Sequence, residues 1–158
     1  MGSYKEDLCL CDWRYRKMRK HIDERVREGL QSEYIEAPSG VLETAKKQLG
    51  AYFRSQRTSF DLPIRMVGSD FQKEVWESLL KIPFGKTTSY AKLATQLGDI
   101  KAIRAVAAAN GANCLSIIVP CHRVLGSDGS MTGYAGGVLA KKKLLRLENA
   151  LRQGELDF

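Results

Sequence analysis

The sequence predicts a mixed α/β (α+β) protein, with a short N-terminal α/β lobe at residues 1–65 and a mainly helical domain at residues 66–158. Three observations lead to this prediction. Residues 8–13 have the apolar character of a short strand and precede two segments with helical periodicity. A linker carrying Pro63 follows. Beyond it, helical segments punctuated by glycine lead to an apolar β-type run that ends at Pro120.

The N-terminal lobe is predicted to hold one strand and two helices. Residues 1–7 are polar, and we expect them to be loose. The charged segment 14–30 carries apolar residues at helical spacing, which is typical of an amphipathic surface helix. Residues 32–40 form a loop, and Ser39 is placed to cap a second helix whose apolar stripe runs through residues 41–53.

Three helices are predicted to follow the linker. Residues 69–72 have the spacing of a capping box, so they open the first helix. We expect four apolar residues on its inward face: Phe71, Val75, Leu79 and Leu80. The second helix spans about residues 89–97 and stops at Gly98, and Asp99 caps the third, residues 101–110. Helix, tight turn and helix make the layout of a helix-turn-helix.

Charge indicates the kind of partner. The net charge is +7, and residues 90–146 hold eight basic against two acidic side chains. A basic surface suggests a polyanion, with nucleic acid favoured over membrane. The third helix places Arg104 beside an alanine face (Ala102, Ala105, Ala108 and Ala109), although such helices are more often packed core than DNA readers.

Targeting and cysteine patterns favour an intracellular, reducing compartment: the cytoplasm, or the nucleus in a eukaryote. The sequence has no membrane-spanning run, no signal-peptide pattern and no disulfide framework among its four cysteines. Cys9, Cys11 and His21 lack the usual zinc-ligand spacing, so we expect no metal. The glycine-rich stretch at 132–137 is not a nucleotide-binding signature, so no cofactor is implied.

The candidate for chemistry is Cys121, which directly follows a predicted strand at residues 115–119 and its terminating proline. The neighbouring His122 makes it a candidate activated nucleophile, because the thiolate is the reactive form of cysteine. The dipeptide alone fits a buried structural cysteine at least as well. The last helix, about residues 138–152, carries Glu148 and is expected to bury three leucines: Leu144, Leu147 and Leu151. We expect the following tail, residues 153–158, to be frayed.

The surroundings of Cys121 resemble one known family. Pro-Cys-His-Arg-Val at residues 120–124, with Asn113 upstream and Tyr-Ala-Gly-Gly at 134–137, is similar to the O6-alkylguanine-DNA alkyltransferases, the methylated-DNA–protein-cysteine methyltransferases. The resemblance extends over roughly residues 40–150. Its other motifs are Phe71-Gln72-x-x-Val75-Trp76, Ile82-Pro83-Phe84-Gly85-Lys86-Thr87, Ser89-Tyr90, Arg104-Ala105-Val106-Ala107 and Lys141 through Glu148.

The resemblance implies a catalytic role for five residues. Cys121 would be the nucleophile and permanent acceptor of the alkyl group, and Asn113 the hinge that braces the active-site turn. His122 would act as the base through a bridging water, with Glu148 orienting it. Neighbouring residues of an extended chain point to opposite faces, so a water joins Cys121 and His122 more easily than direct contact. Tyr90 would help the guanine to leave by donating a proton.

The resemblance also implies sequence-independent binding of double-stranded DNA through the minor groove, by a monomer. Arg104 would enter the duplex in place of a flipped-out base, because O6 of guanine cannot react inside the stack. The other expected DNA contacts are Lys101, Ala102, Ala105 and Arg123. The expected walls of the base pocket are Pro120, Val124, Tyr134 and Ala135.

The implied reaction is displacement at the alkyl carbon of O6-methylguanine, with O4-methylthymine as a further candidate substrate. The product is a thioether, so one protein molecule would repair one lesion without a cofactor. The family's N-terminal lobe is ribonuclease-H-like, and its sheet would be abbreviated or truncated here, since one strand is evident. Cys114 stands where relatives often have a proline, which leaves the rigidity of the hinge open.

Three other classes are weighed against this reading. A non-catalytic lesion-binding protein of the alkyltransferase-like kind would lack the cysteine nucleophile. A helix-turn-helix transcription regulator would leave the Cys-His pair and the glycine-rich loop without a role. A thiol hydrolase would need an oxyanion hole and an independently placed base, and the sequence indicates neither.

Overall fold

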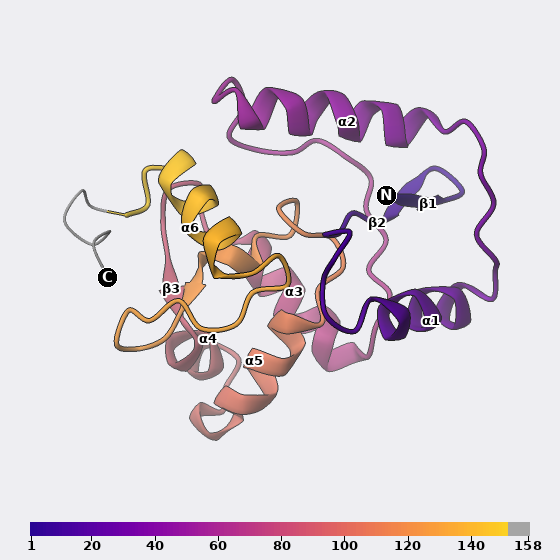
Figure 1. Cartoon of the computed structure of the whole chain (residues 1–158). Coiled ribbons are helices and arrows are strands. Elements are labelled where there is room, and N and C mark those ends of the chain that lie inside the picture. The colour runs from indigo at the N-terminus through magenta and orange to yellow at the C-terminus, as the bar shows by residue number, and fades with distance from the viewer. Residues whose placement is uncertain (152–158) are drawn as a thin grey trace.

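The computed structural model describes residues 1–151 and has a mixed α/β architecture of six α-helices and two small sheets, as the sequence predicts (Figure 1). In chain order, the elements are β1 Gly2–Tyr4, β2 Asp7–Leu10, α1 Arg19–Leu30, α2 Gly40–Phe53, α3 Asp70–Leu80, β3 Thr88–Ser89, α4 Tyr90–Gln96, the 3₁₀ turn η1 Ile100–Ala102, α5 Ile103–Gly111, the 3₁₀ turn η2 Cys121–Arg123, β4 Val124–Leu125 and α6 Val138–Leu147. Within those residues, no helix is both long and apolar enough to cross a bilayer.

The N-terminal lobe begins with a hairpin. The expectation that residues 1–7 are loose is wrong, because β1 and β2 pair antiparallel there. The linker is also more than a spacer: the Leu8 N–H donates to the Pro63 carbonyl at 2.8 Å, and the Arg65 N–H donates to the Leu8 carbonyl at 2.9 Å. These bonds place the linker beside β2 and fix the start of the helical part. A ribonuclease-H-like lobe stays a prediction.

The segment between β2 and α1 is irregular. The helix predicted from residue 14 begins only at Arg19, after Met18 in the left-handed conformation (φ 60°). We call residues 13–18 the strap. Ser39 precedes α2 as expected, but its hydroxyl lies 2.9 Å from that of Ser3 instead of capping the helix. The strap has a helical pattern in its sequence but not a helical backbone, because Arg16 bonds carbonyl groups elsewhere in the chain.

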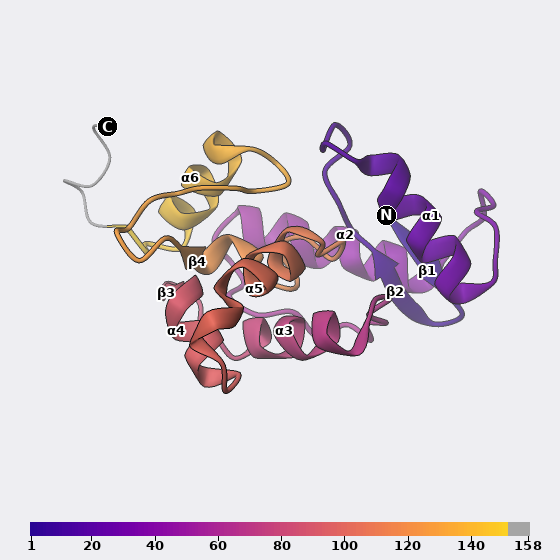
Figure 2. The ribbon, with the colours of Figure 1, turned by 90° about the horizontal axis from the view of Figure 1, so that it is seen from below.

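The helices α3, α4 and α5 pack together along one side of the molecule (Figure 2). The predicted capping box is present: the Ser69 hydroxyl accepts from the Gln72 N–H, and the Gln72 side chain accepts from the Ser69 N–H. The indole of Trp76 donates to the Ala109 carbonyl at 2.8 Å, which ties α3 to α5. Phe71 and Leu80 were expected inside but are exposed, since Trp76 takes the inward position.

The turn between α4 and α5 agrees with the sequence prediction. Gly98 has a left-handed backbone (φ 93°), and the Asp99 carboxylate accepts from the Lys101 N–H at 2.8 Å. The single helix predicted for residues 101–110 is divided into η1 and α5. A helix-turn-helix stays a prediction.

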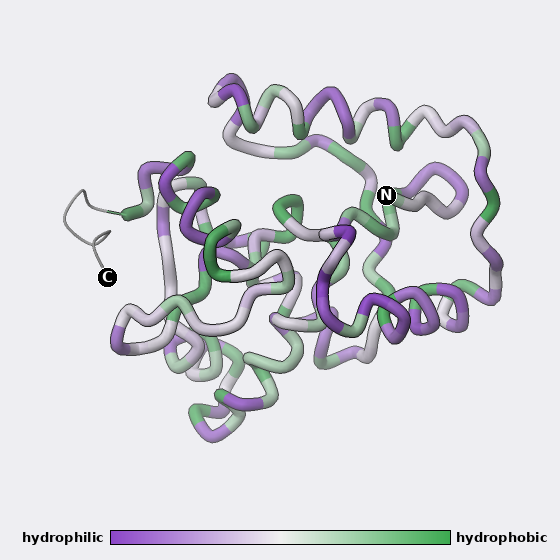
Figure 3. Tube along the Cα trace, viewed as in Figure 1, coloured by the Kyte–Doolittle hydropathy of each residue, from purple (hydrophilic) through white to green (hydrophobic). Residues whose placement is uncertain are grey.

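One core joins the two parts of the chain across residue 65. Leu8 and Val41 pack in the same buried cluster as Val75, Val106 and Val119. Outside this core, Figure 3 shows many hydrophilic residues on the strap and along α1. Two separately folding domains, at residues 1–65 and 66–158, stay a prediction.

The prediction of a strand at residues 115–119 is wrong. Ile117 has a φ of 75°, and the Val119 N–H donates to the Leu115 carbonyl at 2.8 Å, so the run folds into a tight turn. Its outer edge pairs with Cys11, whose N–H donates to Cys114 and whose carbonyl accepts from Ser116. A short apolar run signals burial, and burial is compatible with a turn as well as with a strand.

The last helix is shorter than predicted. α6 ends at Leu147, and Asn149 has a left-handed φ of 54°. Leu144 and Leu145 are buried, whereas Leu147 and Leu151 are half-buried. The expected end of the helix at residue 152 and the expected frayed tail lie outside the described residues.

We expect Ser69→Ala to lower the free energy of unfolding by about 1 kcal/mol, because α3 loses its N-cap. Urea denaturation measures the change. Ser78→Ala is the control, since the Ser78 hydroxyl only bonds the Glu74 carbonyl within the same helix and alanine favours a helix interior. Equal losses in the two variants would contradict a specific capping contribution.

Candidate active site

Cys121 lies at the start of η2, with 2% of its surface exposed. Its Sγ accepts a hydrogen bond from the Asn113 side-chain amide at 3.1 Å. The same amide donates to the Val119 carbonyl at 2.9 Å, and the Asn113 Oδ1 accepts from the Leu115 N–H at 2.9 Å. One asparagine side chain therefore spans the tight turn and reaches the sulfur, which is the bracing position expected of the hinge.

Glu148 is the centre of a buried polar network. Its Oε1 lies 2.8 Å from Nε2 of His122 and accepts from the Tyr52 hydroxyl at 2.6 Å. Its Oε2 accepts from Nε of Arg123 at 2.8 Å. Three side chains from two distant parts of the sequence thus meet around one carboxylate. Sequence reasoning anticipated the pairing of His122 with Glu148 but not the part of Tyr52.

The titration behaviour of these groups follows from burial and pairing. Burial lowers the pKa of His122, and the hydrogen bond to Glu148 only partly opposes this. Burial alone would raise the pKa of Glu148, but hydrogen bonds from His122, Arg123 and Tyr52 outweigh it and lower the pKa to about 2. At neutral pH the site therefore holds a carboxylate beside a neutral imidazole.

A neutral imidazole that donates from Nε2 to the carboxylate keeps its other nitrogen, Nδ1, as an acceptor. His122 Nδ1 is buried and has no hydrogen-bond partner within residues 1–151. Burial also raises the pKa of the Cys121 thiol to about 11, with the Asn113 hydrogen bond and the Lys141 charge opposing the rise. The arrangement offers a protonated thiol next to a group that can accept its proton.

The expectation that Arg123 contacts DNA is wrong. Its side chain is buried and its guanidinium points inward. Besides the bond from Nε, its Nη2 donates to Glu148 Oε1 at 3.0 Å and its Nη1 donates to the Ile82 carbonyl at 2.6 Å. Its charge compensates the buried carboxylate, so it does not lie where a phosphate would be bound.

Tyr90 lies near the thiol, at the start of α4, and burial raises its pKa. Its hydroxyl accepts from the Asn110 side chain at 3.4 Å, and the same Asn110 amide lies 3.4 Å from the Cys121 carbonyl. Sequence reasoning missed Asn110, because nothing in an alanine-rich helix marks one polar residue as buried.

Lys141 is a second buried polar residue to which sequence reasoning gave no role of its own. Its Nζ donates to the Val124 carbonyl at 2.6 Å, and burial lowers its pKa to about 8. It belongs to the basic segment that was expected to form a surface, but its side chain is buried. Lys141 therefore positions the chain immediately after η2.

A cavity of about 1210 Å³ is lined by Tyr90 and by two of the four expected walls of the base pocket, Tyr134 and Ala135. Within residues 1–151, Cys121 and His122 are not among its lining residues. Pro120 and Val124, which were also expected there, are buried and are not among its lining residues in the described part of the chain. The cavity therefore has only two of the four expected walls, because the residues on either side of η2 are packed into the core.

η1 and the exposed face of α5 together carry four of the five expected DNA contacts. Lys101, Arg104 and Ala105 are exposed, and Ala102 is half-buried. Ala109 departs from the expected alanine face, since it is buried against α3 and its carbonyl accepts from Trp76. Ala108 remains exposed and also lines the cavity.

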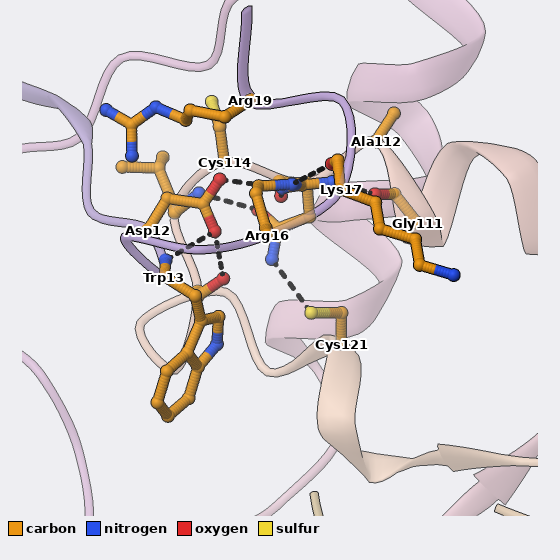
Figure 4. Close-up of polar contacts among 12 residues, drawn as sticks. Asp12, Trp13, Arg16, Lys17, Arg19, Gly111, Ala112, Cys114 and Cys121 are labelled. Carbon is orange, nitrogen blue, oxygen red and sulfur yellow. Dashed lines mark hydrogen bonds and ion pairs between the residues drawn. The ribbon is translucent and has the colours of Figure 1, made fainter. Parts of the chain in front are cut away.

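The strap is attached to the carbonyl groups at the end of α5 (Figure 4). Arg16 donates from Nη2 to Gly111 at 2.6 Å and from Nη1 to Asn113 at 2.8 Å, and its Nη1 also bonds Asp12 at 2.7 Å. Arg25, on α1, donates to the intervening Ala112 carbonyl at 2.8 Å. Three consecutive carbonyls are therefore satisfied by guanidinium groups of the N-terminal lobe, a feature that the sequence did not predict.

The fold and site define a protein with a buried cysteine next to a histidine–glutamate pair. The family described as 6-O-methylguanine DNA methyltransferase, DNA binding domain, matches residues 70–150. The methylated-DNA–protein-cysteine methyltransferase of Methanosarcina barkeri is 46% identical over 137 residues, which cover 84% of this chain and 86% of the relative. That of Mycobacterium tuberculosis is 48% identical over 119 residues, covering 75% and 72%.

Solved structures show the same likeness. The Mycobacterium tuberculosis protein OGT in complex with DNA has a TM-score of 0.80 and 39% identity, covering 94% of this chain and 84% of that one. An O6-methylguanine DNA methyltransferase from Methanococcus jannaschii has a TM-score of 0.58 and 31% identity, covering 76% and 72%. The chain belongs to the O6-methylguanine DNA methyltransferase family, which confirms the resemblance drawn from its sequence.

We expect Glu148→Gln to lower the stability at pH 7 by about 3 kcal/mol, as the linkage between pKa and folding predicts for a carboxyl whose pKa falls to about 2. The contribution is complete above the ordinary carboxyl pKa and is lost as the pH falls toward 2. The difference between wild type and variant should therefore shrink between about pH 4.5 and pH 2.

Urea denaturation at pH 7 and at pH 3 measures this difference. Glu43→Gln is the matched control, because Glu43 is an exposed glutamate that pairs with Lys46 at 2.6 Å on the surface of α2. A difference that stays constant across the pH range would contradict the assignment of Glu148 as the ionised centre of the network.

Proposed function

We propose that this protein repairs O6-methylguanine in DNA by transferring the methyl group directly and irreversibly to Cys121. The observation that carries the proposal is the buried thiol, braced by Asn113 at 3.1 Å and followed by His122 on its carboxylate partner Glu148. Membership of the family and the similarity to methylated-DNA–protein-cysteine methyltransferases support the substrate. O4-methylthymine is a further candidate substrate.

The proton has a route out of the thiol. A water bridging Cys121 and Nδ1 of His122 passes the thiol proton to the imidazole, and Glu148 stabilises the imidazolium that forms. The original reason for the water, an extended chain, does not hold, because both residues lie in η2. The support is now the buried Nδ1, which has no other acceptor or donor within the described residues.

The bond changes are those of a displacement. The thiolate sulfur of Cys121 forms a bond to the methyl carbon while the carbon–O6 bond breaks, and its electron pair leaves with the guanine. Tyr90 donates a proton to the departing base and recovers one from the imidazolium of His122 through solvent. The thioether product is not reversed by thiols, so each molecule acts once, and no cofactor enters the balance.

DNA binding through α5 explains how the lesion reaches the thiol. The exposed Ala105 and Ala108 leave a smooth surface for the minor groove, and Lys101 is placed for a phosphate. Arg104 fills the space left by the methylated base, which flips out toward the cavity beside Tyr90 and Tyr134. This binding mode requires one protein molecule for each lesion and no particular base sequence.

The first experiment is intact-mass measurement after incubation with a duplex that contains one O6-methylguanine. We expect a gain of about one methylene, located on Cys121 by peptide mapping, as for a thiolate that accepts an alkyl group. Cys121→Ser should show no gain, and Cys114→Ser, a second buried cysteine, should gain as the wild type does. Lesion binding without any mass change would instead define a recognition protein with an inert thiol.

A second experiment separates DNA handling from chemistry. We expect Arg104→Ala to slow transfer from duplex DNA by at least tenfold and to leave transfer from free O6-benzylguanine within twofold, because the free base needs no flipping. Rates follow from quenched time courses of labelled protein. Arg54→Ala, an exposed arginine beyond α2, controls for loss of charge. Equal slowing on both substrates would contradict the role of Arg104.

A further inference from the structure

The strap, residues 13–18, is held in place by hydrogen bonds from Arg16 to backbone carbonyl groups. Arg16 points inward to the Gly111 and Asn113 carbonyls, and its partner Asp12 is itself held by the Ser116 hydroxyl at 3.0 Å. Both side chains of this ion pair are almost fully buried, with 6% and 0% exposed. The inward direction of Arg16 is therefore fixed, which fixes where its neighbours in the strap are presented.

The neighbouring side chains face solvent. Arg14, Tyr15 and Lys17 are exposed, and Tyr15 has 88% of its surface accessible. The guanidinium of Arg14 lies over the Tyr15 ring at 5.5 Å. Neither Arg14 nor Lys17 forms an ion pair with an acidic residue among residues 1–151. Two uncompensated cations thus flank an exposed aromatic ring, a combination suited to a nucleic-acid backbone.

The position of the strap relates it to the site. Arg14, Tyr15 and Lys17 line the same cavity as Tyr90 and the Ala107–Ala108 end of α5. Ala108 belongs both to this wall and to the exposed face of α5. A duplex resting on that face would have one strand at the mouth of the cavity, and the strap forms the opposite rim.

We infer that the strap is a second DNA-binding element, in which Arg14 and Lys17 bind phosphates of the strand that borders the cavity, and Tyr15 packs against the adjoining sugar. The inference rests on the proposed function, because duplex DNA is the ligand. The occupant is a sugar–phosphate backbone and not a protein or a membrane, since the two cations lie across the cavity from the exposed cations Lys101 of η1 and Arg104 of α5. In this arrangement the N-terminal lobe contacts the DNA directly.

The test is the salt dependence of binding to a duplex that contains O6-methylguanine, with the inert Cys121→Ser background to prevent turnover. Each lost phosphate contact lowers the slope of log K against log salt by about 0.9, so Arg14→Ala with Lys17→Ala should lower it by about 1.8. Lys5→Ala with Lys47→Ala, two exposed lysines that lie outside the cavity lining, should leave the slope unchanged. Tyr15→Ala should weaken binding several-fold at an unchanged slope.

A slope equal to that of the parent protein, or an equal fall in the control pair, would overturn the inference. Failure of the proposed function is a separate result, since it would appear as no methyl transfer to the wild type. In the wild-type background, the Arg14–Lys17 double variant should transfer from free O6-benzylguanine at the normal rate. A loss there would mean that the strap acts on the thiol and not on DNA.

Discussion

The structure depends on one buried charge, the carboxylate of Glu148. An ionised group can be held in an apolar interior only when cations and hydrogen-bond donors compensate it. Here Arg123 supplies the cation and the Tyr52 hydroxyl donates a hydrogen bond to the carboxylate. The backbone N–H of Gly85 donates a further, longer hydrogen bond to Oε2, with 3.4 Å between nitrogen and oxygen. Gly85 has a left-handed φ of 73°, and a β-carbon there would lie 2.8 Å from the Glu148 carbonyl oxygen. Only glycine therefore lets this loop lie so close to Glu148. These contacts bring α2, the loop after α3, η2 and the end of α6 together.

Burial has a chemical consequence at His122. It is the main cause that lowers the pKa of His122, Glu148 opposes the lowering, and the charge of Arg123 adds to it. The imidazole therefore stays neutral, and its unused nitrogen can accept a proton. The thiol in turn is held protonated by burial, which raises its pKa to about 11. At neutral pH the protein therefore holds a protonated thiol next to a neutral imidazole.

Sequence reasoning succeeded where local hydrogen bonds decide the structure and failed where distant contacts do. The caps at Ser69 and Gly98 were predicted because the residues that make them are a few positions apart. Residues 115–119 were taken for a strand because apolar character reports burial and not backbone direction. Arg123 was taken for a surface cation and Tyr52 was overlooked, since their partner is 25 and 96 residues away. The family was recognised because the neighbours of Cys121 in the sequence carry the family pattern.

The hinge beside Cys121 shows how tertiary contacts can replace a rigid residue. Cys114 stands where the family pattern often has proline, so the chain has no built-in restriction of φ at that position. The turn is instead held from two sides: Asn113 spans it from within, and Arg16 fixes the Gly111 and Asn113 carbonyl groups of the segment that leads into it. The Cys11 N–H adds a bond to the Cys114 carbonyl at 2.8 Å. Because these outer bonds all come from the N-terminal lobe, that lobe contributes to the geometry of the thiol without contacting the reacting atoms.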